Sequence, residues 1–95
     1  MAPIRRLVLD VLKPHEPALV QFTNGVTEVA CVDAVTASLV ELDQEVQNVK
    51  LTIEGETLAI DPITETIEQL GGTVHSVDEV ACGDHVVEAR QTLQD

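Results

Sequence analysis

The side chains best suited to hold a cation are imidazoles and carboxylates near the ends of apolar runs. His15 and Glu16 follow the apolar run 4–12, and Asp43 and Glu45 stand in a short polar link. Carboxylates combined with imidazoles bind divalent cations, and oxygen-rich sets favour calcium or magnesium. The sequence therefore predicts a divalent cation site with these candidate ligands: Asp10, His15, Asp43, Glu45 and His75.

A plainer interpretation competes with this one, because a chain with 17 acidic residues places some of them near any point. Asp10 stands out since it interrupts an apolar run, where a charge needs a partner or water. Either Asp10 forms an ion pair with Lys50 that fixes the register of two strands, or it is the polar floor of a binding groove.

Two cysteines and a histidine form a second candidate metal site. Cys82 and His85 are three positions apart, and with Cys31 they would supply three zinc ligands. The competing interpretation is that both cysteines are small buried apolar residues. A disulfide between them is disfavoured in a reducing cytoplasm.

His75 also suits acid–base chemistry, since acidic residues follow it closely over 75–79. A small enzyme would pair His75 with Asp10. The sequence shows no nucleophile of familiar spacing beside them, no glycine-rich phosphate loop and no cysteine pair two residues apart. The alternative is an edge strand whose charges oppose aggregation. We therefore assign no catalytic residue.

Hydrophobic periodicity predicts the elements that would position these residues. One helix covers 17–29, with Pro17 in its first turn. A second begins at Asp61 as its cap, with Pro62 at the first helical position, and ends at Gly71. Branched apolar residues predict four strands, over 4–12, 35–43, 47–54 and 73–81.

This order of elements is the split βαβ pattern (βαββαβ), which predicts an α+β, ferredoxin-like domain over residues 1–83. The antiparallel sheet would have four strands in the order 4-1-3-2, with two helices on one face. The tail 84–95 forms a short helix or frays. The uncovered face would expose Val8, Leu12 and Val40, and a bare apolar face needs a partner. The cation candidates meet at one end of this sheet, and the cysteines at the other.

The charge of the chain excludes several partners. Its formal net charge is −12, with five basic residues and Phe22 as the single aromatic side chain. Binding to nucleic acid or to an anionic membrane requires clustered lysine and arginine, so neither is expected. The sequence has no long apolar run and no signal-peptide pattern, which predicts a cytoplasmic protein. The dispersed acidic residues beside 44% hydrophobic residues are typical of a folded domain in a salt-rich cytoplasm.

Three stretches of the sequence are distinctive as a set. They are Ile-Arg-Arg-Leu-Val-Leu-Asp-Val-Leu-Lys-Pro at 4–14, Glu-Leu-Asp-Gln-Glu-Val-Gln-Asn-Val-Lys-Leu-Thr-Ile-Glu-Gly at 41–55, and Leu-Gly-Gly-Thr-Val-His-Ser-Val-Asp-Glu-Val at 70–80. Together they resemble an uncharacterised, mainly archaeal family, the domain of unknown function 211. The resemblance implies a ferredoxin-like fold and a ring-like homo-oligomer, and the acidic composition suggests a haloarchaeal member. It implies no activity.

Three function classes stay open. The first is a non-enzymatic binding or regulatory module, a homo-oligomer that binds a divalent cation or a small ligand at one sheet end or at a subunit interface. The second is a small enzyme built at subunit interfaces, with His75 and Asp10 as acid and base. The third is a protein-interaction scaffold without a ligand.

Overall fold

Within residues 2–85, four strands and two helices follow one another in the predicted order βαββαβ. The computed structural model describes residues 2–85. Helix α1 (Leu19–Thr27) separates β1 from β2, and α2 (Ile60–Gln69) separates β3 from β4. The strands are β1 (Ile4–Pro14), β2 (Ala34–Leu42), β3 (Val46–Glu54) and β4 (Thr73–Cys82).

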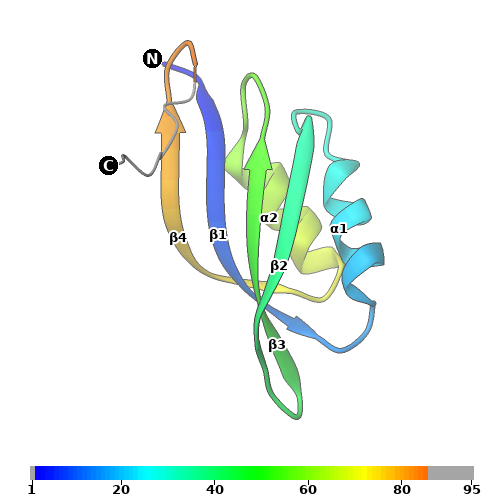
Figure 1. Cartoon of the computed structure of the whole chain (residues 1–95). Coiled ribbons are helices and arrows are strands. Elements are labelled where there is room, and N and C mark those ends of the chain that lie inside the picture. The colour runs from blue at the N-terminus through cyan, green and yellow to red at the C-terminus, as the bar shows by residue number, and fades with distance from the viewer. Residues whose placement is uncertain (1, 86–95) are drawn as a thin grey trace, which may run out of the picture.

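The strands form one antiparallel sheet in the order β2-β3-β1-β4. Both helices lie on the same face of this sheet, and the tip of the β2–β3 hairpin projects beyond them (Figure 1). This is the ferredoxin-like α+β fold, so the predicted class and strand order are confirmed. β1 and β3 are central strands, and they carry most of the buried apolar residues of the sheet.

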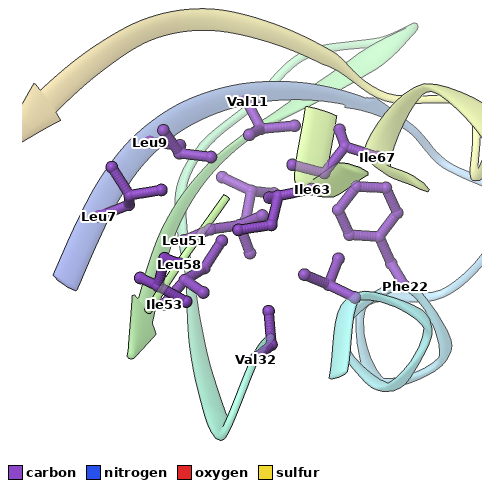
Figure 2. Packing of buried hydrophobic residues seen from close by; sticks show 12 residues of the cluster. Leu7, Leu9, Val11, Phe22, Val32, Leu51, Ile53, Leu58, Ile63 and Ile67 are labelled. Atoms are coloured by element: carbon purple, nitrogen blue, oxygen red, sulfur yellow. The ribbon is translucent and has the colours of Figure 1, made fainter. Parts of the chain in front are cut away.

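The core lies between the sheet and the helices (Figure 2). Alternate residues of β1 and β3 face it, because successive side chains of a strand point to opposite faces. Phe22 and Val26 of α1 and Ile63 and Ile67 of α2 pack onto them. The strand residues of the core are Leu7, Leu9, Val11, Val49, Leu51 and Ile53, all buried.

The helix starts differ from those predicted. α1 begins at Leu19, so Pro17 precedes the helix instead of lying in its first turn. α2 begins at Ile60 with Ala59 as its N-cap, and no side chain caps it. The predicted cap, Asp61, lies inside the first turn, where a carboxylate interacts favourably with the helix dipole. The predicted stop is confirmed, since Gly71 follows the helix with a φ of 96°.

The open face is not the bare apolar surface that the sequence predicts. Val8 is only 7% exposed, because it lies between Thr52 on β3 and Glu79 on β4 in the sheet register. Leu12 is half-buried, and only Val40 is largely exposed. The neighbours of these residues on this face are mainly polar, which the pattern of β1 alone did not reveal.

The exposed large apolar side chains lie mostly on the two edge strands. Leu39, Val40 and Leu42 are about half or more exposed on β2, and Val77 and Val80 are about half exposed on β4. Neither helix of residues 2–85 is long and apolar enough to cross a membrane. The predicted helix over 84–95 falls outside the described residues, apart from Asp84 and His85.

Candidate functional site

The candidate site is a hollow of about 670 Å³ that opens to solvent at the hairpin end of the sheet. Asp10 and Leu12 place it on the face away from the helices, since they alternate with the core residue Val11. We call it the hairpin hollow. The residues that line it are Asp10, Leu12, Glu41, Leu42, Asp43, Gln44, Val46, Asn48 and His75.

Asp10 forms part of this lining and is held by the neighbouring strand. Asn48 Nδ2 donates a hydrogen bond of 2.7 Å to Asp10 Oδ1. The predicted ion pair with Lys50 is wrong, although the two residues are direct partners in the register. Both ion pairs within residues 2–85 use Arg6 instead. The shorter Asn48, a diagonal neighbour across β1 and β3, takes the place beside Asp10, and Lys50 is exposed to solvent.

Asp43 shapes the rim of the hollow through the hairpin turn. Its backbone N–H donates to the carbonyl of Val46, and its carboxylate accepts from the backbone N–H of Gln44. His15 Nε2 lies 3.0 Å from the backbone oxygen of Asp43, so the loop after β1 contacts this turn. The turn therefore has a fixed local structure that faces the end of β1.

The structure brings three of the five predicted cation ligands to the hollow, which are Asp10, Asp43 and His75. His15 and Glu45 are exposed at the same end but do not line it. Within residues 2–85, no three histidine, cysteine or acidic side chains gather closely enough to hold a metal ion as they stand. The divalent cation site stays a prediction.

Sequence reasoning missed Glu41 and Asn48 in the lining. A register shift in β2 between Leu39 and Glu41 brings Glu41 opposite Asn48. Such a bulge changes which side chains share a face, and no glycine or proline marks it in the sequence. Asn48 was predictable in part, because the pairing of β1 with β3 places it diagonally from Asp10.

The cysteine candidates lie apart from one another. Cys31 precedes β2 and Cys82 ends β4, and these are the two edge strands of the sheet. Three strand spacings separate the edges, roughly 14 Å. Cys31 is half-buried and its Sγ accepts from the N–H of Ala59 at 3.4 Å, whereas Cys82 and His85 are exposed. Both thiols are free, and the interpretation of two buried apolar cysteines is wrong for Cys82.

The polar residues of β4 are mostly engaged in local contacts. Ser76 Oγ donates to Asp78 Oδ1 at 2.8 Å, and Glu79 accepts from Arg6 at 3.4 Å. His75 is exposed and lines the hollow with Asp10. Acid–base chemistry at this pair stays a prediction.

Lys13 is a fully buried residue that the sequence analysis did not single out. Its Nζ donates to the carbonyl of Pro14 at 2.8 Å and to Gln47 Oε1 at 2.9 Å, and lies 5.9 Å from the centre of the Phe22 ring. Burial lowers the pKa of Lys13, and the charge of Glu16 partly opposes that shift. Lys13 lies on the helix side of β1, so it is separated from the hollow.

The fold and the polar hollow define a small ferredoxin-like α+β domain with one candidate ligand site. The family model of the domain of unknown function 211, described as an uncharacterized ArCR, matches residues 5–95. The chain belongs to this family. It is 48% identical over 95 residues to an uncharacterized protein of Methanocaldococcus jannaschii. The alignment covers 100% of this chain and 98% of that protein.

Proposed function

We propose that this chain is a small binding module whose site is the hairpin hollow and whose ligand carries a positive charge. The composition of the lining is the observation that supports this. Three carboxylates, Asp10, Glu41 and Asp43, and the imidazole of His75 line the hollow, and no lysine or arginine of residues 2–85 lines it. The net charge of −12 adds a long-range attraction for cations.

A binding role is favoured over catalysis by the same lining. As far as the described part of the chain goes, this lining contains no hydroxyl, thiol or amine that could act as a nucleophile. Ser76, the nearest hydroxyl in the sequence to His75, donates its hydrogen bond to Asp78. The chemistry that these residues support best is therefore recognition of charge.

Thermal unfolding with added calcium, magnesium or zinc tests the predicted divalent cation. A ligand at 100 times its dissociation constant adds about 2.7 kcal/mol. For a domain of this size, the melting temperature then rises by roughly ten degrees or more. Asp10→Asn should remove most of that rise. Glu65→Gln, which changes the charge equally on the exposed side of α2, should leave it intact.

An equal rise in all three proteins would mean that the cation binds elsewhere. No rise with these ions or with the organic cations described below would contradict the proposal. Binding of any cation that depends on Asp10 would support it, and the identity of the ion would then choose between a metal and an organic ligand.

Self-association belongs to the same proposal. Its support is the exposed apolar surface of the two edge strands, Leu39 and Leu42 on β2 and Val77 and Val80 on β4. Edge strands also carry unpaired backbone groups that a second copy can bind. We expect light scattering to give a mass above that of one chain, and Val77→Glu with Val80→Glu to lower it. A wild-type mass of one chain would contradict self-association.

We further propose that the module works in a salt-rich cytoplasm, as a haloarchaeal protein would. The dispersed negative charge and the two lysines support this.

A further inference from the structure

We infer that the ligand of the hairpin hollow is an organic ammonium ion with a short aliphatic chain. This inference rests on the proposed function and adds the chemical class of the ligand. Three properties of the hollow support it, which are its size, the division of its lining into a polar and an apolar part, and the orientation of Asp10.

The size of the hollow suits a small organic molecule. Its volume of about 670 Å³ falls within the range of small-molecule sites, roughly 300–1,000 Å³. A bare metal ion needs several oxygen ligands converging within about 2.6 Å. The described part of the chain gathers no such set of three, and the acidic residues of the lining come from separate elements, β1 and the β2–β3 hairpin.

The lining is divided in the way that an alkylammonium ion would require. Asp10 and Asn48 supply a polar floor, while Leu12 and Val46, on the same face of β1 and β3, supply an apolar part of the wall. Both apolar residues are half-buried, so part of their surface still contacts water. An aliphatic chain that contacts Leu12 and Val46 would remove this surface from water, and a metal ion would not.

Asp10 is oriented to accept from a ligand. Asn48 holds Oδ1, and within residues 2–85 the carboxylate makes no other hydrogen bond or ion pair. The second oxygen of Asp10 is therefore available. A primary ammonium carries three N–H donors, so it can bond to Asp10 and to an acidic residue of the hairpin at the same time. Hydrogen bonds between two charged groups are the stronger class.

Dissociation constants from ligand-detected NMR titration test this inference on the full chain. The first probe is butylammonium, and three others each lack one of its properties. Butyltrimethylammonium lacks the N–H donors, 1-butanol lacks the charge, and ammonium chloride lacks the aliphatic chain. We expect butylammonium to bind most tightly of the four. Asp10→Asn should weaken it roughly tenfold or more, as loss of a charged hydrogen bond does. Val46→Ser should weaken it severalfold, and Glu65→Gln should not change it.

Each other outcome overturns the inference in a distinguishable way. Equal binding of 1-butanol would show that the hollow does not recognise the charge of the ligand. Equal binding of ammonium would show that it does not recognise the aliphatic part of the ligand. Equal binding of butyltrimethylammonium would remove the role of the N–H donors. Binding of calcium or magnesium without butylammonium would overturn the inference and leave the proposed function standing. If no cation binds, both this inference and the proposed function are wrong. Circular dichroism on each variant separates a lost site from a lost fold, and Val46→Ser tests the site if Asp10→Asn unfolds.

Discussion

At the scale of single residues, two of the charged side chains of β1, Asp10 and Lys13, have opposite signs and lie on opposite faces of the strand. Asp10 lies on the open face, where one oxygen is bonded to Asn48 and the hollow gives access to the other. Lys13 lies on the helix side, where it is fully buried and its Nζ donates hydrogen bonds to the carbonyl of Pro14 and to Gln47 Oε1. The first is placed to recognise a ligand, whereas the second fixes the end of the strand beneath Phe22.

The burial of Lys13 predicts a pH dependence of stability. Its pKa in the folded chain lies below the ordinary value of 10.5. Between these two pKa values the unfolded chain binds more protons, so the free energy of unfolding rises with pH. The stability of the wild type relative to Lys13→Met should therefore increase from pH 7 towards 10.5. The increase is about 1.4 kcal/mol for each pH unit that separates the pKa of the folded chain from that of the unfolded chain.

Urea unfolding of both proteins across that pH range measures this difference, in which the other titrating groups cancel. A difference that stays constant, or that falls as the pH rises, would show that the folded chain does not penalise the charged form of Lys13.

Arg6 predicts a second residue-scale effect, because it joins three strands. Its guanidinium lies 2.9 Å from Glu54 on β3 and 3.4 Å from Glu79 on β4, and the hydrogen bond to Glu54 raises the pKa of Arg6. Arg6→Leu should lower the free energy of unfolding by about 1–2 kcal/mol, between the values for an exposed ion pair and a charged hydrogen bond. The decrease in the free energy of unfolding caused by Arg6→Leu should be smaller in 1 M salt.

Arg5→Leu is the matched control for this change, since it removes the same charge from the next position. Arg5 makes no ion pair within residues 2–85, so its replacement should change the free energy by no more than about 0.5 kcal/mol. Equal losses in the two variants would mean that net charge, and not the bridge between strands, accounts for the effect.

At the scale of elements, the connection from β3 to α2 depends on a close backbone approach at Gly55. A Cβ there would collide with the backbone oxygen of Cys31 and lie 2.7 Å from Leu58 Cδ2. A backbone oxygen held by its own loop cannot move aside easily. Gly55→Ala should therefore lower the free energy of unfolding by about 1–3 kcal/mol in urea titrations.

Gly25→Ala supplies the contrast. A Cβ at Gly25 would also meet an atom at 2.7 Å, but that atom is Cδ1 of Leu70, at the end of a flexible side chain. Alanine also favours the helix over glycine by about 1 kcal/mol. Gly25→Ala should thus cause a clearly smaller loss than Gly55→Ala. The reverse order would contradict the account of both contacts.

The elements themselves were largely predictable from the sequence, and the reasons are local. Alternation along β1 and β3 and helical spacing around Ile63 and Ile67 follow from burial of one face, which periodicity detects. The helix starts were not predictable in the same way. Asp61 has the right type for a cap, but α2 starts two residues earlier than this requires, with Ala59 as its N-cap.

The candidate site was only partly predictable, because it depends on register as well as topology. Topology alone brings Asp10, Asp43 and His75 to one end of the sheet, as the sequence analysis predicted. Glu41 and Asn48 join them through a bulge in β2 and a diagonal contact across β1 and β3. Register shifts of this kind arise from the packing of whole strands, so no short stretch of sequence specifies them.

At the scale of the whole molecule, the charge of −12 predicts that salt stabilises the fold. Raising KCl from 0.1 to 1 M shortens the screening length from about 10 to 3 Å, which weakens repulsion among exposed acidic residues. The melting temperature should rise by several degrees, with a similar rise in NaCl at equal ionic strength. A melting temperature that stays flat or falls would contradict both the repulsion and the proposed salt-rich setting.

The central claim is that the hairpin hollow binds a cationic ligand, and protein-detected NMR tests it most directly. Butylammonium would be titrated into ¹⁵N-labelled chain while amide shifts are followed residue by residue. We predict that the shifted amides cluster around the hollow, at Asp10, Leu42, Asn48 and His75. Shifts that cluster instead around the second hollow, lined by Cys31, Asp33 and Glu56 among others, or that spread evenly over the acidic surface, would contradict the claim.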